Sequence, residues 1–326
     1  MSKTRHERCP HCGSLKVIKW GRQRGHQRYK CKQCGGMFTF RRKDVSRSNR
    51  FVWFEWWILR KQTVAQIAEL SGSSERQLYR WFDEYLENYP HWRIQRREKV
   101  NLLIDGTWFP NKMCLVVYRD ERVKATLLYR LTDNEWEEEI TEDIENLKSV
   151  GVEIESITSD GGRSIIKAAR KACPNAIRQR CLAHIQRECL IWITKHPQSE
   201  AGIELRKIVC MISLIKTHND RRQWISDFNV WTEKYKDYLD QKTFKEESHR
   251  EWYTHKMVRR IKKALPDMFY YLDNPRIPKT TNALESFFGH LKENVSLHRG
   301  MSYRHYQNYL KWYLYFRNKD NKNKGK

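Results

Sequence analysis

Apolar and polar residues alternate through the middle of the chain in a pattern that predicts several strands and then helices. Strands are expected at residues 100–109, 113–118 and 125–131, where apolar residues recur between short turns rich in Asp and Arg. An acidic amphipathic helix is expected from about residue 134 to residue 150, with Gly151 as its stop. Its eight acids between residues 133 and 145 are more typical of a solvated helix face than of a metal site.

A second run of strands and helices follows. A strand at residues 154–160 ends at Gly161 and Gly162 and leads into a helix at 163–173, and a short strand at 176–180 precedes a further helix. Three hairpin strands followed by helix, strand, helix, strand and helix is the order of an RNase H-like fold. We therefore expect an α/β catalytic core of this kind, whose first part spans residues 99–194.

The rest of the core is expected to be helical. Residues 195–265 are rich in Lys, Glu and Trp and lack strand patterning, so they are predicted to form an all-helical insertion. Residues 266–318 are predicted to supply the C-terminal helices of the core. Residues 319–326 are polar and rich in Lys, which predicts a basic, disordered tail.

A helix-turn-helix pattern precedes the core, in residues 49–98. An apolar and aromatic helix is expected at 51–60, followed by helices at 63–70 and 75–82 on either side of a turn that contains glycine. Thr63 and either Ser73 or Ser74 are suited to N-cap these two helices. The pattern favours DNA binding over an ordinary helical hairpin. The residues of the second helix expected to face DNA are Arg76, Gln77 and Arg80.

Residues 1–48 contain two cysteine pairs. Cys9 and Cys12 form the first pair, Cys31 and Cys34 form the second, and 18 residues separate them. This spacing is that of a four-thiolate zinc ribbon, and the intervening residues alternate between polar and apolar as short strands do. The pattern predicts one structural Zn²⁺ on these four thiols, in preference to chance pairing or disulfides.

The charge of the chain indicates a polyanionic partner. The formal net charge is +24, and residues 1–50 hold 15 Lys/Arg against 2 Asp/Glu, a net +13. Beside the ordered cysteines, this charge favours nucleic acid over a solubility tail or an anionic membrane surface. No run of 18 apolar residues and no signal peptide is visible, so a cytoplasmic location without a membrane is expected. The arginines expected to contact DNA are Arg22, Arg24, Arg28, Arg41, Arg42 and, in a basic loop, Arg299.

Two acids are expected to meet in the predicted sheet. Asp105 lies on its first strand and Asp160 at the end of its fourth, and these strands are neighbours in the expected order. Either acid alone is weak evidence, because an Asp followed by Gly is often a turn residue. Hydrolysis and transfer of phosphodiesters require carboxylates that converge from different elements on two hard cations. A third carboxylate is therefore expected from a helix after the sheet.

Four motifs in order resemble the Mutator-like superfamily of DDE transposases, and the architecture is similar to its bacterial insertion-sequence members with an N-terminal zinc-binding region. The motifs are Asp105-Gly-Thr-Trp, Ser159-Asp160-Gly-Gly, Cys181-Leu-Ala-His184 and Thr280-Thr-Asn-Ala-Leu-Glu285. The resemblance implies that Asp105, Asp160 and Glu285 are catalytic acids that hold two Mg²⁺ ions, for which Mn²⁺ can substitute. Glu285 also fits the first turn of a helix, and Glu293, two turns on, is its nearest competitor.

The resemblance further implies the reaction and the partners. Such an enzyme binds the terminal inverted repeats of an insertion sequence in double-stranded DNA, cleaves strands there and joins the released 3′ end to target DNA. A homodimer is expected, because two ends must be joined, and the expected location is the bacterial nucleoid. Two alternatives stay open: a transposase-derived, sequence-specific DNA-binding regulator, and a structure-specific nuclease with an RNase H fold. The three intact acids argue against the first, and the DNA-binding front end and the insertion argue against the second.

Three further residues are candidates for work near the site. Cys181 and His184 stand three apart, so they share a helix face. They are too few for a tight zinc site, and core packing or orientation of the active site is favoured for them. Trp224 and Trp231 also share a helix face. The resemblance implies that an insertion tryptophan, for which Trp224 is preferred, stacks on a displaced base, and core packing is the alternative.

Overall fold

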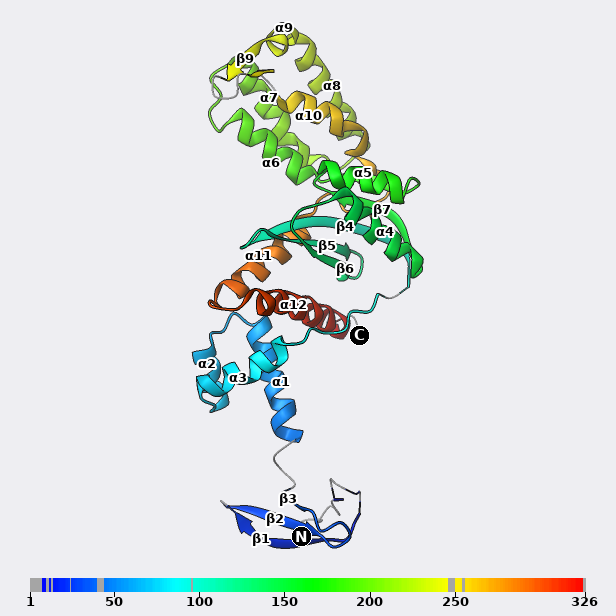
Figure 1. The fold of residues 1–326 in the computed structure, drawn as a ribbon. Coiled ribbons are helices and arrows are strands. Elements are labelled where there is room, and N and C mark those ends of the chain that lie inside the picture. Colours follow the sequence, from blue (N-terminus) through cyan, green and yellow to red (C-terminus); the bar gives the residue numbers. More distant parts are fainter. Residues whose placement is uncertain are drawn as a thin grey trace. The chain divides into compact units, whose positions relative to one another are not determined.

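A computed structural model gives the fold of the chain (Figure 1). It describes residues 8–9, 12, 14–23, 25–39, 44–94, 96–245, 250–253 and 256–324. The chain divides into two compact units, Met1–Asn88 and Tyr89–Lys326. The first unit contains the two cysteine pairs and the expected helix-turn-helix, and the second contains the three acids.

The N-terminal part of the first unit is a small antiparallel sheet. Its strands are β1 (Val17–Gln23), β2 (His26–Cys31) and β3 (Met37–Phe38), in the order β1-β2-β3. The turn between β1 and β2 contains Gly25 at φ 77°, a left-handed conformation that glycine adopts without strain. Cys31 ends β2 and Cys34 lies in the turn before β3, so the hairpins of the sheet fix the second cysteine pair.

The rest of the first unit is helical. Its helices are α1 (Asp44–Leu59), α2 (Val64–Ser71) and α3 (Glu75–Leu86). Thr63 caps α2, as predicted, and does so in a capping box with Gln66; Ser74, one of the two serines that the sequence offered, caps α3. Gly72, at φ 64°, ends α2 and allows the sharp turn into α3. The buried rings of Phe54 and Phe82, 5.9 Å apart, pack α1 against α3.

A mixed five-stranded sheet forms the centre of the second unit. Its order is β6-β5-β4-β7-β8. The hairpin strands β4 (Arg97–Phe109), β5 (Met113–Asp120) and β6 (Ala125–Thr132) are antiparallel, whereas β7 (Val152–Ser159) runs parallel to β4 and β8 (Ile177–Arg180) runs parallel to β7. The five strands and their adjacency agree with the sequence prediction, and β4 and β7 lie side by side.

Helices cover both faces of this sheet (Figure 1). Even-numbered residues of β4, such as Leu102 and Ile104, pack against α4 (Glu137–Ser149) and α5 (Arg163–Ala172) in one buried core. The other face carries α11 (Asn282–Ser296) and α12 (Tyr303–Lys324), where Tyr306 packs against Phe109 of β4. The amide of Asn318 forms two hydrogen bonds with the backbone of Thr126 on β6, at 2.9 and 2.7 Å.

A second hydrophobic core lies among the helices beyond α5 (Figure 1). It joins α6 (Leu182–Ile193) to the predicted insertion, so α6 packs with the residues that follow it in the chain. Besides α6, the elements there are α7 (Glu200–Met211), α8 (His218–Lys234), α9 (Lys236–Asp240), α10 (Lys256–Ala264) and 3-10 helices at Ile212–Leu214, Leu265–Asp267 and Tyr270–Leu272.

Three expectations about secondary structure need correction. The insertion is not all-helical, because β9 (Lys242–Lys245) and β10 (Arg250–Tyr253) form an antiparallel hairpin in it. These two short segments contain one Thr and three aromatic residues among eight, and both types favour strands. The helix α12 extends to Lys324, into the stretch expected to be a disordered tail. The acidic helix α4 begins at Glu137 rather than near residue 134.

The acids of α4 are not simply a solvated face. Asp143 is buried and its two oxygens accept hydrogen bonds from the guanidinium of Arg130 on β6, at 2.8 and 2.6 Å. Glu142 accepts another from the same group at 2.7 Å. This pairing ties α4 to the edge of the sheet, and it leaves the other acids of the helix to solvent or to neighbours. One of them, Glu137, pairs with Lys167 of α5 at 2.8 Å.

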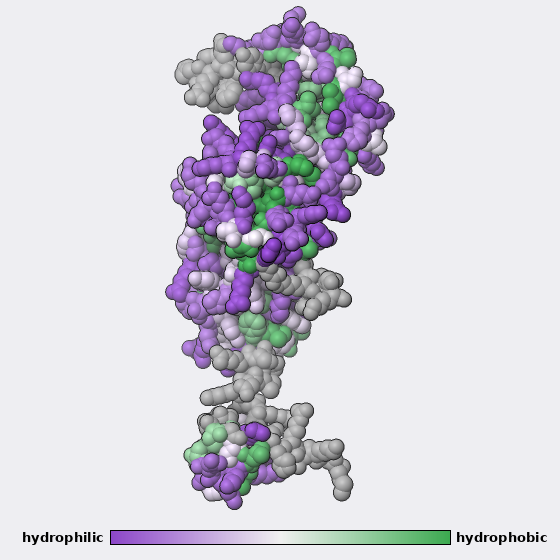
Figure 2. Space-filling model, turned by 90° about the vertical axis from the view of Figure 1, so that its right-hand side faces the viewer, coloured by the Kyte–Doolittle hydropathy of each residue, from purple (hydrophilic) through white to green (hydrophobic). Residues whose placement is uncertain are grey.

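Figure 2 shows one face on which hydrophilic residues predominate and apolar residues form smaller patches between them. Within the described residues, no helix is both long enough and apolar enough to span a membrane.

Candidate active site

The sheet brings Asp105 and Asp160 together. Leu103 of β4 pairs with Thr158 of β7 in parallel register, and both acids lie two residues further along their strands. Asp105 is still within β4, and Asp160 is the first residue after β7. Because parallel strands end at the same edge of a sheet, the two carboxylates lie near each other. Their mutual repulsion contributes to the raised pKa of Asp105.

Asp105 is a buried carboxyl group, 8% exposed. Burial, followed by the negative charge of Asp160, raises its pKa from the ordinary 3.8 to about 7. Its Oδ1 accepts a hydrogen bond from the amide of Gly106 at 3.0 Å, and Asp160 Oδ1 accepts one from the amide of Gly162 at 2.8 Å. Among the described residues, no Lys or Arg forms an ion pair with either carboxylate.

The arginine beside Asp160 is engaged elsewhere. Arg180 of β8 is buried, and its guanidinium donates to the backbone carbonyl of Asp160 at 2.9 Å rather than to the carboxylate. The guanidinium fills the space over Gly161, whose φ is 85°. A Cβ on Gly161 would lie within 2.1 Å of the guanidinium atoms. Arg180 therefore supports the loop that carries Asp160, and any side chain at Gly161 would displace it.

Glu285 lies in the first turn of α11, as predicted. Its Oε2 accepts a hydrogen bond from Arg187 of α6 at 2.8 Å, and its Oε1 lies 3.4 Å from His184 Nδ1. His184 in turn senses the charges of both Asp105 and Glu285, which help to raise its pKa. The charge of this imidazole is therefore coupled both to an acid of the sheet and to the acid of α11.

Cys181 and His184 form a polar cluster with Thr281 beneath Glu285. Cys181 Sγ lies 3.3 Å from His184 Nδ1 and accepts hydrogen bonds from the amide and the hydroxyl of Thr281, at 3.2 and 3.4 Å. The hydrogen bond with Cys181 raises the pKa of His184 to about 9. Burial opposes the ionisation of Cys181, but its hydrogen bonds with His184 and Thr281 lower the pKa of the thiol overall. The same contact thus favours the ionised form of the thiol and the protonated form of the imidazole.

This cluster explains two sequence features. Thr281 is the N-cap residue of α11, but its side chain makes no cap hydrogen bond because its hydroxyl is directed to Cys181 and lies 3.3 Å from His184 Nδ1. The two residues of the Cys-x-x-His motif are the start of α6, and they join that helix to α11. Sequence reasoning placed Cys181 and His184 near the site but missed Arg187 and Thr281, whose partners are distant in the chain.

A fourth acid, Glu135, also lies at this end of the sheet. Its Oε1 lies 2.0 Å from the position that a Cβ on Gly106 would take. Burial and the charge of Asp160 raise its pKa. In the sequence, Glu135 belongs with the acids of the helix that follows, which are predicted to be solvated, and nothing in its local pattern sets it apart.

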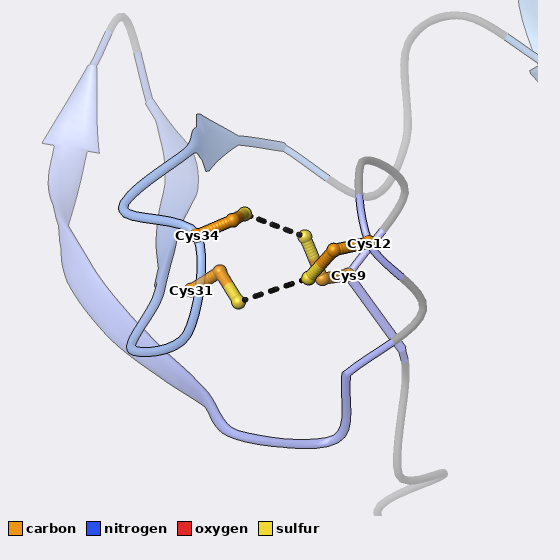
Figure 3. Close-up of side chains that lie close together, drawn as sticks. All are labelled: Cys9, Cys12, Cys31 and Cys34. Atoms are coloured by element: carbon orange, nitrogen blue, oxygen red, sulfur yellow. Dashed lines mark hydrogen bonds between the residues drawn. The ribbon is translucent and has the colours of Figure 1, made fainter.

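The four N-terminal cysteines form a separate cluster. Figure 3 shows Cys9 and Cys12 facing Cys31 and Cys34. Cys9 Sγ lies 3.7 Å from Cys34 Sγ and Cys12 Sγ lies 3.6 Å from Cys31 Sγ, and all four sulfurs lie within 4.8 Å of one another. Backbone amides, that of Cys34 first, lower the pKa of the Cys31 thiol to about 6.

These sulfur distances fit a metal better than a disulfide. A disulfide needs sulfurs about 2.05 Å apart. A tetrahedral zinc site with bonds of about 2.3 Å separates its sulfurs by about 3.8 Å. Within the described residues, these four thiols form a group of possible metal ligands whose ligand atoms all lie within 4.8 Å of one another. The described carboxylates of the second unit do not form such a group of three or more, because they are more widely spaced.

Comparison with known proteins identifies the family. Residues 114–287, more than half of the chain, match the model described as "Transposase IS66 family". The chain belongs to the IS66 family of transposases. The matched residues include Asp160 and Glu285 and begin nine residues after Asp105.

The family confirms the expectation of an insertion-sequence transposase of the DDE type. It is a different family name from the Mutator-like superfamily, which stays a prediction. No curated protein matches the chain. One similar solved structure is the simian T-cell lymphotropic virus intasome in complex with PP2A regulatory subunit B56 gamma, with 12% identity over 51% of this chain and 69% of that chain. Its TM-score of 0.21 is too low to support an argument about this transposase.

The residues expected to face DNA have different surroundings. Arg76, Gln77 and Arg80 are exposed on α3, on the side opposite its buried residues, and Arg22 on β1 and Arg299 in the loop after α11 are exposed as well. Arg28 is half-buried, with its guanidinium 3.2 Å from Met37 Sδ. Arg24, Arg41 and Arg42 lie outside the described residues.

The expectation that Trp224 stacks on a displaced base does not agree with its position. Trp224 is 4% exposed, its ring stacks on Phe228 at 5.5 Å, and its indole N–H donates to the carbonyl of Ile208 at 2.8 Å. Trp231 is buried in the same core and donates to Ala201 at 3.0 Å. Neither ring offers a face to a base, so core packing, the alternative weighed from the sequence, accounts for both.

Proposed function

We propose that this IS66-family transposase cleaves and joins DNA strands with Asp105, Asp160 and Glu285, in a core of the RNase H-like type. The observation that carries the proposal is the buried Asp105 carboxylate beside Asp160 at one edge of the sheet, with no Lys or Arg of the described residues paired to either. Buried carboxylates of like charge are unfavourable unless a cation neutralises them. The pair thus fits a divalent cation with hard oxygen ligands.

Each residue of the site has a distinct task in this proposal. Asp105 and Asp160 supply ligand oxygens from fixed strand positions, and Glu285 supplies a third carboxylate from α11. Two Mg²⁺ or Mn²⁺ ions, when bound, activate the attacking oxygen and stabilise the leaving oxygen. The attacking group is water in strand cleavage and a DNA 3′-hydroxyl in joining, so no side chain of the protein acts as a nucleophile.

The surroundings of Glu285 hold it in place. His184 and Arg187 are both on α6 and both approach the carboxylate of Glu285, which keeps α11 directed at the edge of the sheet. Thr281 and Cys181 hold the His184 ring in turn. These residues orient the third acid and are positioning residues.

The first unit is proposed to bind DNA. The four thiols fit one structural Zn²⁺ by their spacing. The exposed Arg76, Gln77 and Arg80 would bind a terminal inverted repeat through the major groove, and Arg22 would contact phosphates. A homodimer on DNA would allow two ends to be cut and joined together.

The test uses the purified full chain, a labelled terminal-repeat duplex and Mg²⁺. Asp105→Asn, Asp160→Asn and Glu285→Gln should each abolish cleavage and leave repeat binding nearly unchanged, because each amide keeps the shape and removes the charge that holds a cation. Glu293→Gln, on the exposed side of α11, is the matched control and should cut like the parent. Mn²⁺ should replace Mg²⁺, and Ca²⁺ should support binding with little chemistry.

Three results would contradict parts of this proposal. Activity in all three variants would refute the mechanism. A dead Glu293→Gln beside an active Glu285→Gln would show that the third acid is misassigned. Tight repeat binding by the parent, with no cleavage under any metal, would point to the DNA-binding regulator.

A further inference from the structure

Glu135 lies in the short connection between β6 and α4, next to the strand that carries Asp105. Its Oε1 occupies the space beside Gly106, 2.0 Å from the position of a Cβ there. Its Oε2 lies 3.7 Å from the position of a Cβ on Gly162, and Asp160 Oδ1 lies 3.4 Å from that same point. The carboxylates of Glu135 and Asp160 therefore approach Gly162 together, at the start of α5.

Gly106 makes this approach feasible, because a Cβ there would lie 2.0 Å from Glu135 Oε1, whereas a Cβ on Gly162 would lie at ordinary contact distances of 3.4 and 3.7 Å. Gly106 and Gly162 both have φ values outside the left-handed region, so their backbone conformations do not require glycine. Gly106 belongs to the even-numbered residues of β4 that face α4 and α5, where Leu102 and Ile104 fill the core. Without a side chain at this position, the carboxylate of Glu135 can lie against the strand. Any larger residue at position 106 would displace it.

The position of Glu135 is not explained by capping of α4. Acids at a helix N-terminus are favourable because they interact with its dipole. Glu137, Glu138 and Glu139 already fill the first turn of α4, and the N-cap residue Trp136 makes no side-chain cap hydrogen bond. The side chain of Glu135 instead extends toward Gly106 and Asp160.

The charges around Glu135 are negative. Asp160 raises its pKa in addition to burial, and Glu135 in turn contributes to the raised pKa of Asp105. Two basic residues on the packed elements have other partners: Lys167 of α5 pairs with Glu137, and Arg130 of β6 pairs with Asp143 and Glu142. In the described residues, neither a salt bridge nor a side-chain hydrogen bond to the Glu135 carboxylate is present. Glu285 differs, because Arg187 neutralises it.

We propose that Glu135 is a fourth carboxylate of the active site and binds the same divalent cation as Asp105 and Asp160. The inference rests on the proposed function, because it assigns a further ligand to that metal site. In this proposal the ligands come from β4, from the end of β7 and from the β6–α4 connection, while Glu285 approaches from α11, and the bound cation would draw together carboxylates that are more widely spaced without it. Glu135 contacts the cation and supplies charge, and Gly106 provides the space that it needs.

The experiment measures metal binding itself, with Mn²⁺ as the probe and the zinc-loaded full chain as the protein. Free Mn²⁺ is followed by electron paramagnetic resonance during titration. Glu135→Gln should weaken Mn²⁺ binding at least tenfold, and Asp105→Asn should weaken it as much or more. Glu138→Gln, which changes an exposed acid on the first turn of α4, is the matched control and should bind Mn²⁺ within twofold of the parent.

A second measurement separates a ligand from a structural acid. In Mg²⁺-free buffer at pH 8, Glu135→Gln should melt at the same temperature as the parent or higher, because it removes one of several repelling charges. A lower melting temperature, with Mn²⁺ affinity unchanged, would show that Glu135 only supports the fold. Gly106→Ala should weaken Mn²⁺ binding like Glu135→Gln, since its methyl group occupies the place of the carboxylate.

The outcomes also distinguish this inference from the proposed function. If Glu135→Gln binds Mn²⁺ like the parent while Asp105→Asn does not, Glu135 is not a ligand and the three-acid site stands. If the parent binds no Mn²⁺, or if Asp105→Asn binds it unchanged, the metal site of the proposed function is itself wrong.

Discussion

Replacing Asp105 with asparagine should stabilise the metal-free protein at high pH, which is the reverse of the usual effect of changing a buried residue. In the folded state, burial and then the charge of Asp160 raise the pKa of this carboxyl from 3.8 to about 7. Above pH 7 it is ionised in both the folded and the unfolded chain, so folding must bury a repelled charge. Asparagine is similar in shape and has no charge to bury.

The size of the effect follows from the two pKa values. Each pKa unit corresponds to about 1.4 kcal/mol, so at pH 8 the charge destabilises the fold by about 4 kcal/mol. At pH 5 the folded carboxyl is protonated while the unfolded one is mostly ionised, and the penalty falls to about 1.6 kcal/mol. The contribution of Asp105 to stability is thus most favourable at low pH and is lost as pH rises through about 7. Relative to Asp105→Asn, the free energy of unfolding of the parent should fall by roughly 2–3 kcal/mol between pH 5 and pH 8.

Calorimetry of the full chain in Mg²⁺-free buffer at pH 5 and pH 8 measures this difference. For a unit of this size, each kcal/mol corresponds to roughly 2–4 °C of melting temperature. The gap in melting temperature between Asp105→Asn and the parent should therefore widen by roughly 5–10 °C from pH 5 to pH 8. The relevant unfolding transition is the one whose melting temperature rises when Mg²⁺ is added to the parent at pH 8. Added Mg²⁺ should not raise the melting temperature of this transition in Asp105→Asn. Asp237→Asn, exposed on α9, is the matched control and should show no such gap.

A gap that stays constant within about 0.5 kcal/mol between the two pH values would refute the reasoning, because it would show that no buried charge titrates at this position. A gap that widens without any response to Mg²⁺ would support the burial of Asp105 and contradict its role as a metal ligand.

Three further predictions concern other parts of the chain. Metal analysis of the full chain should find about one zinc, which Cys31→Ser loses and Cys210→Ser, a change at an exposed thiol on α7, retains. Trp224→Ala should lower the free energy of unfolding of the second unit by about 3–5 kcal/mol, as for other buried aromatic residues. Trp192 is 58% exposed, so Trp192→Ala should change it by less than about 0.5 kcal/mol. Equal effects of the two substitutions in denaturant titrations would contradict the burial of Trp224. Arg80→Ala should weaken repeat binding by about 1–3 kcal/mol in gel-shift titrations with cleavage of bound substrate intact, and unchanged affinity would exclude α3 as the reading helix.

Local features were predictable from the sequence. The spacing of the cysteine pairs predicted their close approach, because a Cys-x-x-Cys turn places two thiols on one side of the chain. The caps at Thr63 and Ser74 followed from residue types that satisfy free backbone amides. The order of strands predicted that Asp105 and Asp160 would be neighbours, since a strand that returns parallel to the first needs a long crossover connection, usually a helix, and such a helix is predicted between them. These features depend on residues close in sequence or on the sheet topology.

What surrounds each side chain was decided by the tertiary structure. Glu135 and Glu142 are alike in a pattern of polar residues, yet one approaches Asp160 and the other pairs with Arg130. The helical period placed Trp224 and Trp231 on one face, but only the packing of α8 against its neighbours showed that this face is buried.

The environment of Glu285 could not be predicted either, because its partners His184 and Arg187 come from a helix about 100 residues earlier in the chain. The physical reason is the same in each case. Periodicity and capping depend on bonds between near neighbours, whereas burial, ion pairing and the pKa of an acid depend on which distant segments fill the space around it. The sequence of this transposase therefore determined its elements and the acids of its sheet, and the folded structure determined which other side chains those acids meet.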